Sequence, residues 1–123
     1  MPNYKYYNRN PENINMNDCV CRAISTVSGL SYETTDRLLS RIAKQYDCSK
    51  LYCDCYSHLL THIFGYEKYI CKRDKTVSEV IDDFPNNKLI LRIEGHLTAA
   101  IRGNIYDTWD CTDKLVDCFW VAR

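Results

Sequence analysis

Along this chain the segments that predict helices come first and most of those that predict strands come after them, so the two kinds do not alternate. Helical patterns dominate up to about residue 84, and strand patterns dominate from residue 89 onward. A parallel sheet needs a long crossover, usually a helix, between successive strands, and no such alternation is present. The order therefore predicts an α+β fold whose N-terminal helices pack on a C-terminal antiparallel sheet. The length of 123 residues fits a single domain over residues 1–123.

The helix signals have recognisable ends. Apolar side chains recur at helical spacing in four segments, residues 19–28, 32–45, 56–64 and 76–84. Asp18 and Ser31 are residue types that cap helix N-termini, and Gly29 ends the first helix. Thr76 and Glu79 have the spacing of a capping box, which predicts where the fourth helix begins.

Strand signals occur in five segments, residues 67–71, 89–93, 96–102, 105–109 and 115–121. A tight hairpin turn at residues 103–104 is expected to join the third and fourth of them. That turn pairs Asp107 with residue 99 or 100, so contact between Asp107 and His96 would need a bulge, a twist or a diagonal approach.

Composition limits the classes of function. Lys plus Arg and Asp plus Glu both number 16, so the net charge is zero and no basic face supports a nucleic-acid partner. Residues 1–17 are polar and lack the apolar region of a signal peptide. No later segment is long enough to span a bilayer. We therefore expect a cytoplasmic protein that does not insert in membranes.

Eight cysteines are many for this length. Without a signal peptide we expect mostly free thiols. One alternative is a structural zinc site, because Cys48 precedes a cluster of residue types that bind zinc, namely Cys53, Cys55, His58 and His62. The Cys-x-Cys spacing is unusual for zinc, and a chain of this size can fold without a metal, so we expect no cofactor.

Cys19 lies at the predicted start of the first helix. A cysteine is a good nucleophile only as thiolate, and lowering its pKa from about 8.5 to about 4 requires roughly 6 kcal/mol. A helix N-terminus supplies about 0.3–1 kcal/mol, so a partner such as protonated His96 must provide most of the shift. Cys21 lies roughly 200° further around the helix and cannot face the same cleft. Asp107, if it reaches His96, would orient the imidazole.

Three short stretches around Cys19, His96 and Asp107 resemble papain-like cysteine peptidases, especially small bacterial and phage-type members such as the double-glycine leader peptidases. The resemblance is carried by Asn17-Asp18-Cys19-Val20-Cys21-Arg22-Ala23, Gly95-His96-Leu97-Thr98-Ala99 and Asp107-Thr108-Trp109. It implies a papain-like fold in which the nucleophile begins the first helix and the histidine and carboxylate lie on later strands.

By this resemblance, Cys19, His96 and Asp107 form a catalytic triad that hydrolyses an amide of a peptide or protein substrate through an acyl-enzyme. The family usually has a glutamine six residues before the cysteine, which contributes to the oxyanion hole. Asn13 occupies that position here, and Asn15 or Asn17 could replace it. Losing one such donor raises the barrier by about 2.7–4 kcal/mol.

Two other classes of function remain open. The chain could be an inactive papain-like module that binds a partner or host protein, since ten tyrosines offer amphipathic contact surface. It could also be a small zinc-stabilised domain. Rapid alkylation of Cys19 at acid-to-neutral pH would favour the enzyme over the binding module.

Overall fold

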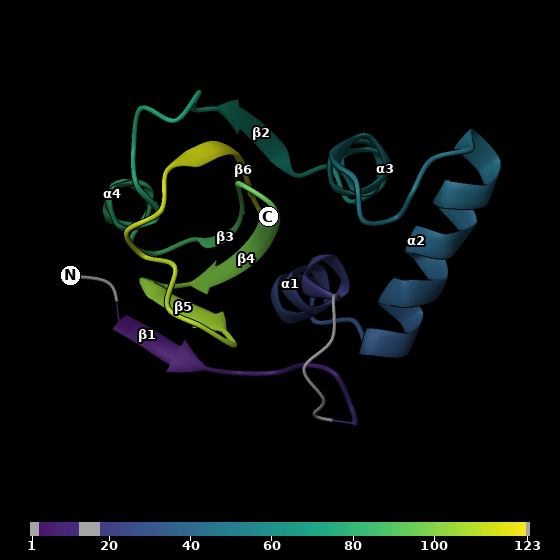
Figure 1. Cartoon of the computed structure of the whole chain (residues 1–123), viewed down its shortest axis with the longest axis horizontal. Helices are drawn as coiled ribbons and strands as arrows, with labels where there is room; N and C mark the ends of the chain where they lie inside the picture. The colour runs from purple at the N-terminus through teal and green to yellow at the C-terminus, as the bar shows by residue number, and fades with distance from the viewer. Residues whose placement is uncertain (1–2, 13–17, 123) are drawn as a thin grey trace.

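A computed structural model describes residues 3–12 and 18–122 (Figure 1). The helical elements are α1 (Cys19–Ser28), α2 (Tyr32–Tyr46), α3 (Cys53–His58), the π-helical turn η1 (Leu59–Ile63) and α4 (Val77–Asp83). The strands are β1 (Asn3–Tyr6), β2 (Glu67–Ile70), β3 (Lys88–Ile93), β4 (His96–Ile101), β5 (Asn104–Asp107) and β6 (Val116–Val121). They form one six-stranded sheet in the order β1-β5-β4-β3-β6-β2. The predicted α+β class is confirmed.

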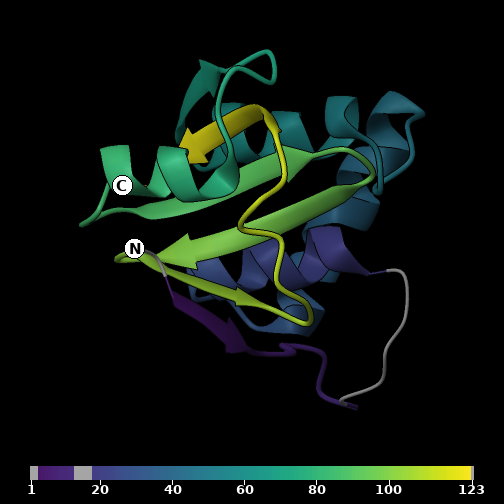
Figure 2. The same cartoon turned by 60° about the vertical axis from the view of Figure 1, so that its left-hand side comes forward.

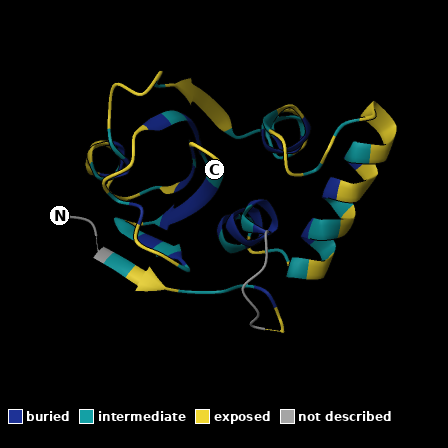
Figure 3. Ribbon diagram, viewed as in Figure 1, coloured by how far each residue is buried: buried dark blue, intermediate teal, exposed yellow. Residues whose placement is uncertain are grey.

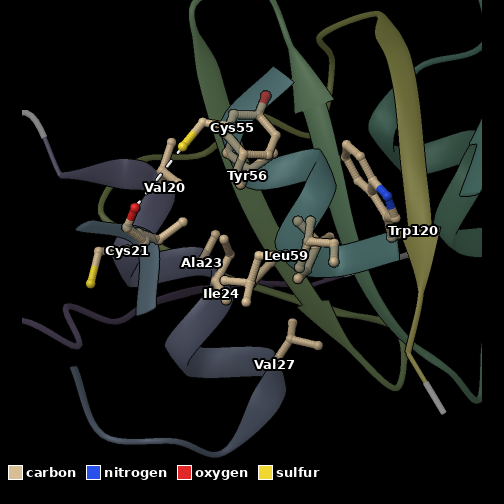
Figure 4. Packing of buried hydrophobic residues seen from close by; sticks show 14 of the residues in the cluster. Val20, Cys21, Ala23, Ile24, Val27, Cys55, Tyr56, Leu59 and Trp120 are labelled. Carbon is tan, nitrogen blue, oxygen red and sulfur yellow. Dashed lines mark hydrogen bonds between the residues drawn. The ribbon is translucent and has the colours of Figure 1, made fainter. Parts of the chain in front are cut away.

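The sheet separates two apolar clusters. Successive strand residues point to opposite faces, so Ile90 packs with α1 and α3 whereas Leu91 packs with α4. Figures 1 and 2 show α4 on one side of the sheet and α1 to α3 on the other. Burial is deepest in β3, β4 and α1, while α2 keeps an exposed outer stripe (Figure 3). Figure 4 shows Ile24, Leu59 and Trp120 meeting in the first cluster. This packing fixes the start of α1 against β4.

Helix boundaries follow the sequence signals with two corrections. The Ser31 hydroxyl caps α2 by accepting from the Thr34 N–H, and the capping box of α4 is present. The third helix was expected over residues 56–64, but it begins at Cys53 and widens into a π-helical turn. Asp18 precedes α1 without a side-chain cap, because its carboxylate bonds Arg22 instead.

The hairpin turn between β4 and β5 lies one residue earlier than expected. Arg102 and Gly103 both have positive φ, 49° and 85°, which a two-residue type I′ turn requires. Because a hairpin register changes by two when its turn moves by one, Asp107 lies across from Thr98 and not from residue 99 or 100. His96 is then the diagonal neighbour of Asp107 on the same face. The expected pairing was wrong, and the diagonal approach is the one observed.

The sequence reading missed strand β1. It pairs in parallel with β5 and makes the sheet mixed, whereas an antiparallel sheet was expected. The segment after it continues along β5, with the Tyr7 N–H donating to the Asp107 carbonyl at 2.9 Å. The other strand pairs are antiparallel. No helix among the described residues is both long and apolar enough to cross a bilayer.

Candidate thiol-based active site

The start of α1 meets the start of β4. Cys19 is the first residue of α1 and is half-buried, and α1 packs along β4. His96 and the backbone N–H of Leu97 lie close enough to the sulfur to lower the pKa of the Cys19 thiol. Gly95 has a φ of +66°, a conformation that favours glycine, and it forms the turn that brings His96 to this position. The structure therefore brings together the two residues that the sequence pairs.

The His96 imidazole lies between the thiol and a carboxylate. Its Nε2 is 2.6 Å from Asp107 Oδ2, so Nδ1 is the ring nitrogen that does not bond this carboxylate. Burial works to lower the pKa of His96, but the hydrogen bonds to Asp107 and Cys19 outweigh burial and raise the pKa to about 9. Burial likewise works to raise the pKa of Cys19, but the bonds from His96 and Leu97 hold it below its ordinary value. Both directions favour a thiolate–imidazolium pair.

Asp107 is held as an ionised carboxylate. Burial works to raise its pKa, but bonds from His96, Thr98 and the Thr108 N–H hold it below the usual range. Thr98 donates to Oδ2 at 2.6 Å, and the Thr108 N–H donates to Oδ1 at 2.7 Å. The Trp109 ring packs on the imidazole at a centroid distance of 5.0 Å. The imidazole orientation is therefore fixed by hydrogen bonds and by packing.

A buried ion network under the site was missed by the sequence reading. Arg22 Nε donates to Asp18 Oδ1 at 2.7 Å, and Arg22 Nη1 donates to Thr108 at 3.0 Å and lies 3.6 Å from Asp107 Oδ1. Tyr32 and Asn10 donate to the other Asp18 oxygen. The i,i+4 spacing of Asp18 and Arg22 was the available signal. The network joins the first turn of α1 to the end of β5.

The other cysteine of the first turn faces elsewhere, as the helical spacing predicts. The Cys21 thiol donates to the Tyr32 carbonyl at 3.4 Å, and burial raises its pKa to about 12. Figure 4 shows Cys21 at the far edge of the cluster from Trp120. Cys19 is therefore the thiol of α1 that the surroundings activate.

A cleft of about 300 Å³ opens beside the thiol, and Cys19 and His96 both line it. Tyr52 and Tyr56 line it from the α3 side, and Arg92 lines it from β3. The cleft is large enough for a substrate side chain next to a scissile bond. No residue of the described segment 3–12 lines it. Asn13, Asn15 and Asn17, the expected oxyanion donors, lie outside the described residues.

The candidate zinc ligands do not converge. Cys55 is buried with its sulfur toward the Leu39 carbonyl, whereas Cys53 has Cys118 as its neighbour. The His58 and His62 rings lie at a tilt to each other on the helix surface, with their centroids 5.2 Å apart. Among the described residues, the ligand atoms that do converge are those of His96, Asp107 and Cys111, within 4.8 Å of one another.

That second set is poorly suited to a metal. Its imidazole and carboxylate already share a hydrogen bond of 2.6 Å. Burial raises the pKa of Cys111 to about 12, so its thiol resists the deprotonation that metal binding requires. The geometry fits proton handling between His96 and Asp107 better than coordination.

Comparison with protein-family models, with curated proteins and with solved structures finds no match to this chain.

Proposed function

We propose that this chain is a papain-like, thiol-dependent amide hydrolase acting on a peptide or protein. The observation that carries the proposal is the position of His96, which lines the same cleft as Cys19, lowers the pKa of its thiol, and bonds Asp107 through Nε2 at 2.6 Å. A nucleophile next to a base, with the base oriented by a third group, is the geometry of nucleophilic acyl transfer.

The first chemical step uses the thiolate. Cys19 attacks the carbonyl carbon of the amide, a C–S bond forms, and the π electrons move to the oxygen. The backbone N–H of Cys19 is a suitable donor for this oxyanion, because the first N–H groups of a helix have no intrahelical acceptor. Asn13 is the proposed second donor. The C–N bond then breaks, and the His96 imidazolium protonates the leaving amine.

The second step returns the enzyme to its starting form. Neutral His96 takes a proton from water, which attacks the thioester and releases the carboxylic acid and the Cys19 thiolate. Asp107 keeps the imidazole in place through both proton transfers. The side chains of His96 and Asp107 are largely buried, which limits their contact with solvent and strengthens the electrostatic interaction between them.

Replacing the nucleophile tests the proposal. We expect Cys19→Ala to abolish cleavage of a mixed peptide library, read by mass spectrometry, because no acyl-enzyme can form. Cys21→Ala is the matched control, since it removes a thiol two residues away that faces Tyr32. Cleavage that persists in Cys19→Ala, with circular dichroism showing both variants folded, would reject the assignment.

A further inference from the structure

Arg92 is a cation in the cleft beside the candidate nucleophile. In the register of the sheet it lies opposite Leu97, the residue that follows His96. It lies two residues after buried Ile90 on the same strand, so its side chain leaves the sheet on the same face, the one covered by α1 and α3. The guanidinium therefore reaches the same cleft as the thiol, and it lines that cleft.

Among the described residues, no carboxylate lies within ion-pair distance of Arg92. Asp117, which acts on it electrostatically, already bonds Arg73 at 2.8 Å. The contrast with Arg22 is clear, because that buried cation is paired with Asp18. A half-buried arginine without a carboxylate partner is uncommon, since desolvating a charge is unfavourable unless an anion compensates it.

The cleft around Arg92 already stabilises negative charge. The neighbouring Cys118 holds the pKa of Cys53 below its ordinary value, against the effect of burial, and Arg92 adds to the lowering. Cys53 also lines the cleft. A cysteine sulfur is a weak acceptor, however, and that of Cys53 already has Cys118 as its neighbour. In the part of the chain that the structure describes, the N–H groups of Arg92 therefore remain available to an oxygen anion.

We propose that Arg92 binds a carboxylate of the substrate, so that the amide cleaved at Cys19 belongs to a peptide with a carboxylate close to the scissile bond. This inference rests on the proposed function. A guanidinium matches a carboxylate in charge and in its two-pronged hydrogen bonding. A single guanidinium, in a cleft whose remaining walls include Leu51 and Tyr52, suits one negative charge better than a doubly charged phosphate. The carboxylate is either an acidic side chain or the C-terminal group of the peptide.

Comparing the rates at which a charged and a neutral reagent alkylate Cys19 tests whether Arg92 binds anions, and it needs no known substrate. Iodoacetate carries a carboxylate and iodoacetamide is its neutral counterpart, so the ratio of their rates at Cys19 reports anion binding in the cleft. The measurement uses a Cys53→Ser background, which leaves Cys19 as the activated thiol of the cleft, and peptide mapping assigns the modified residue. Because His96 attracts iodoacetate equally in every variant, the comparison between variants isolates Arg92.

We expect Arg92→Gln to lower the iodoacetate-to-iodoacetamide ratio about tenfold, as the loss of a charge-assisted hydrogen bond implies. Arg92→Lys should keep most of the ratio, because it retains the charge. Arg102→Gln is the matched control, since Arg102 is exposed at the far end of β4 from His96, and it should leave the ratio unchanged. A ratio that stays within twofold in Arg92→Gln overturns the inference.

Four peptides distinguish the two sources of the carboxylate. They carry Glu or Gln next to the scissile amide and end in a free acid or an amide. Faster cleavage of the Glu peptide with an amide end assigns an acidic side chain, and faster cleavage of the Gln peptide with a free acid assigns the C-terminus. Equal rates for all four contradict the role of Arg92. If no peptide is cleaved, the hydrolase assignment fails, and the alkylation ratio still decides whether Arg92 binds anions.

Discussion

At the scale of single residues, the charge of Asp107 matters as much as its position. The carboxylate accepts from His96, Thr98 and the Thr108 N–H, so it both orients the imidazole and stabilises its protonated form. An asparagine can keep the orientation but not the charge. Replacing Asp107 therefore separates these two contributions.

We predict that Asp107→Asn raises the apparent pKa of Cys19 by about one unit and Asp107→Ala by more, since one unit corresponds to about 1.4 kcal/mol of lost electrostatic support. The pH dependence of iodoacetamide alkylation at Cys19 measures both shifts. Thr98→Val is the comparison, because it removes one donor to the carboxylate and leaves its charge. An unchanged profile in Asp107→Ala would show that the carboxylate does not act on the thiol through His96.

At the scale of secondary-structure elements, the first turn of α1 depends on a buried ion pair. Arg22 and Asp18 are 9 % and 7 % exposed in their side chains, and their bond joins α1 to the segment before it. Removing one member of a buried pair leaves the other charge uncompensated. The turn that presents Cys19 is therefore sensitive to changes beneath it.

We predict that Arg22→Leu lowers the free energy of unfolding by about 3 kcal/mol, measured by urea denaturation. The double variant Asp18→Asn/Arg22→Leu should recover part of this loss, because no buried charge remains unpaired within that pair. Lys50→Met breaks the exposed pair with Asp36 and should cost less than about 1 kcal/mol. Equal losses in Arg22→Leu and Lys50→Met would contradict the importance of burial.

The elements differ in how far the sequence predicts them. Strong local signals place α1, the α2 cap and the capping box of α4 correctly, because each depends on a few neighbouring residues. The turn at Arg102 and Gly103 was missed because a positive φ is uncommon for arginine. Strand β1 was missed because a polar edge strand becomes stable only through its pairing with β5.

In the candidate site, too, the sequence predicts what depends on neighbouring residues but not what depends on strand pairing. Helix position and residue type are enough to propose Cys19 and His96 from the sequence. The contact between His96 and Asp107 depends on the register of two strands, which a one-residue change in the turn alters. Arg92 carries no motif. Its relation to the thiol comes from pairing across β3 and β4, and the sheet topology is needed to see it.

At the scale of the whole molecule, the site couples folding to protonation. His96 has its pKa raised to about 9 in the folded chain, so its stabilisation is complete below pH 6.5 and is lost as pH rises through 9. The lowered pKa of Cys19 has the opposite effect on the free energy of unfolding, which it raises as the pH rises. A thiolate–imidazolium pair and a thiol–imidazole pair bind the same number of protons. In the wild type the two effects therefore offset each other near neutral pH.

We predict that removing the titrating thiol exposes the histidine contribution. In Cys19→Ser, where Asp107 still supports the imidazolium, the free energy of unfolding should fall by about 1–2 kcal/mol between pH 6 and pH 10 relative to Cys19→Ser/His96→Gln. Urea denaturation of both variants across this range measures the difference. Parallel curves would show that His96 is not held protonated by the fold.

The most direct test of the thiolate–imidazolium pair is the pH profile of iodoacetamide alkylation at Cys19, read by peptide mass mapping. It compares chains with and without His96→Ala, both in the Cys53→Ser background. With His96 present, we predict reactivity that begins well below the ordinary thiol pKa of about 8.5. His96→Ala should move that onset to about 8.5 or higher. A Cys19 that is inert, or that reacts with the same profile in both chains, would contradict the pair and with it the proposed hydrolase.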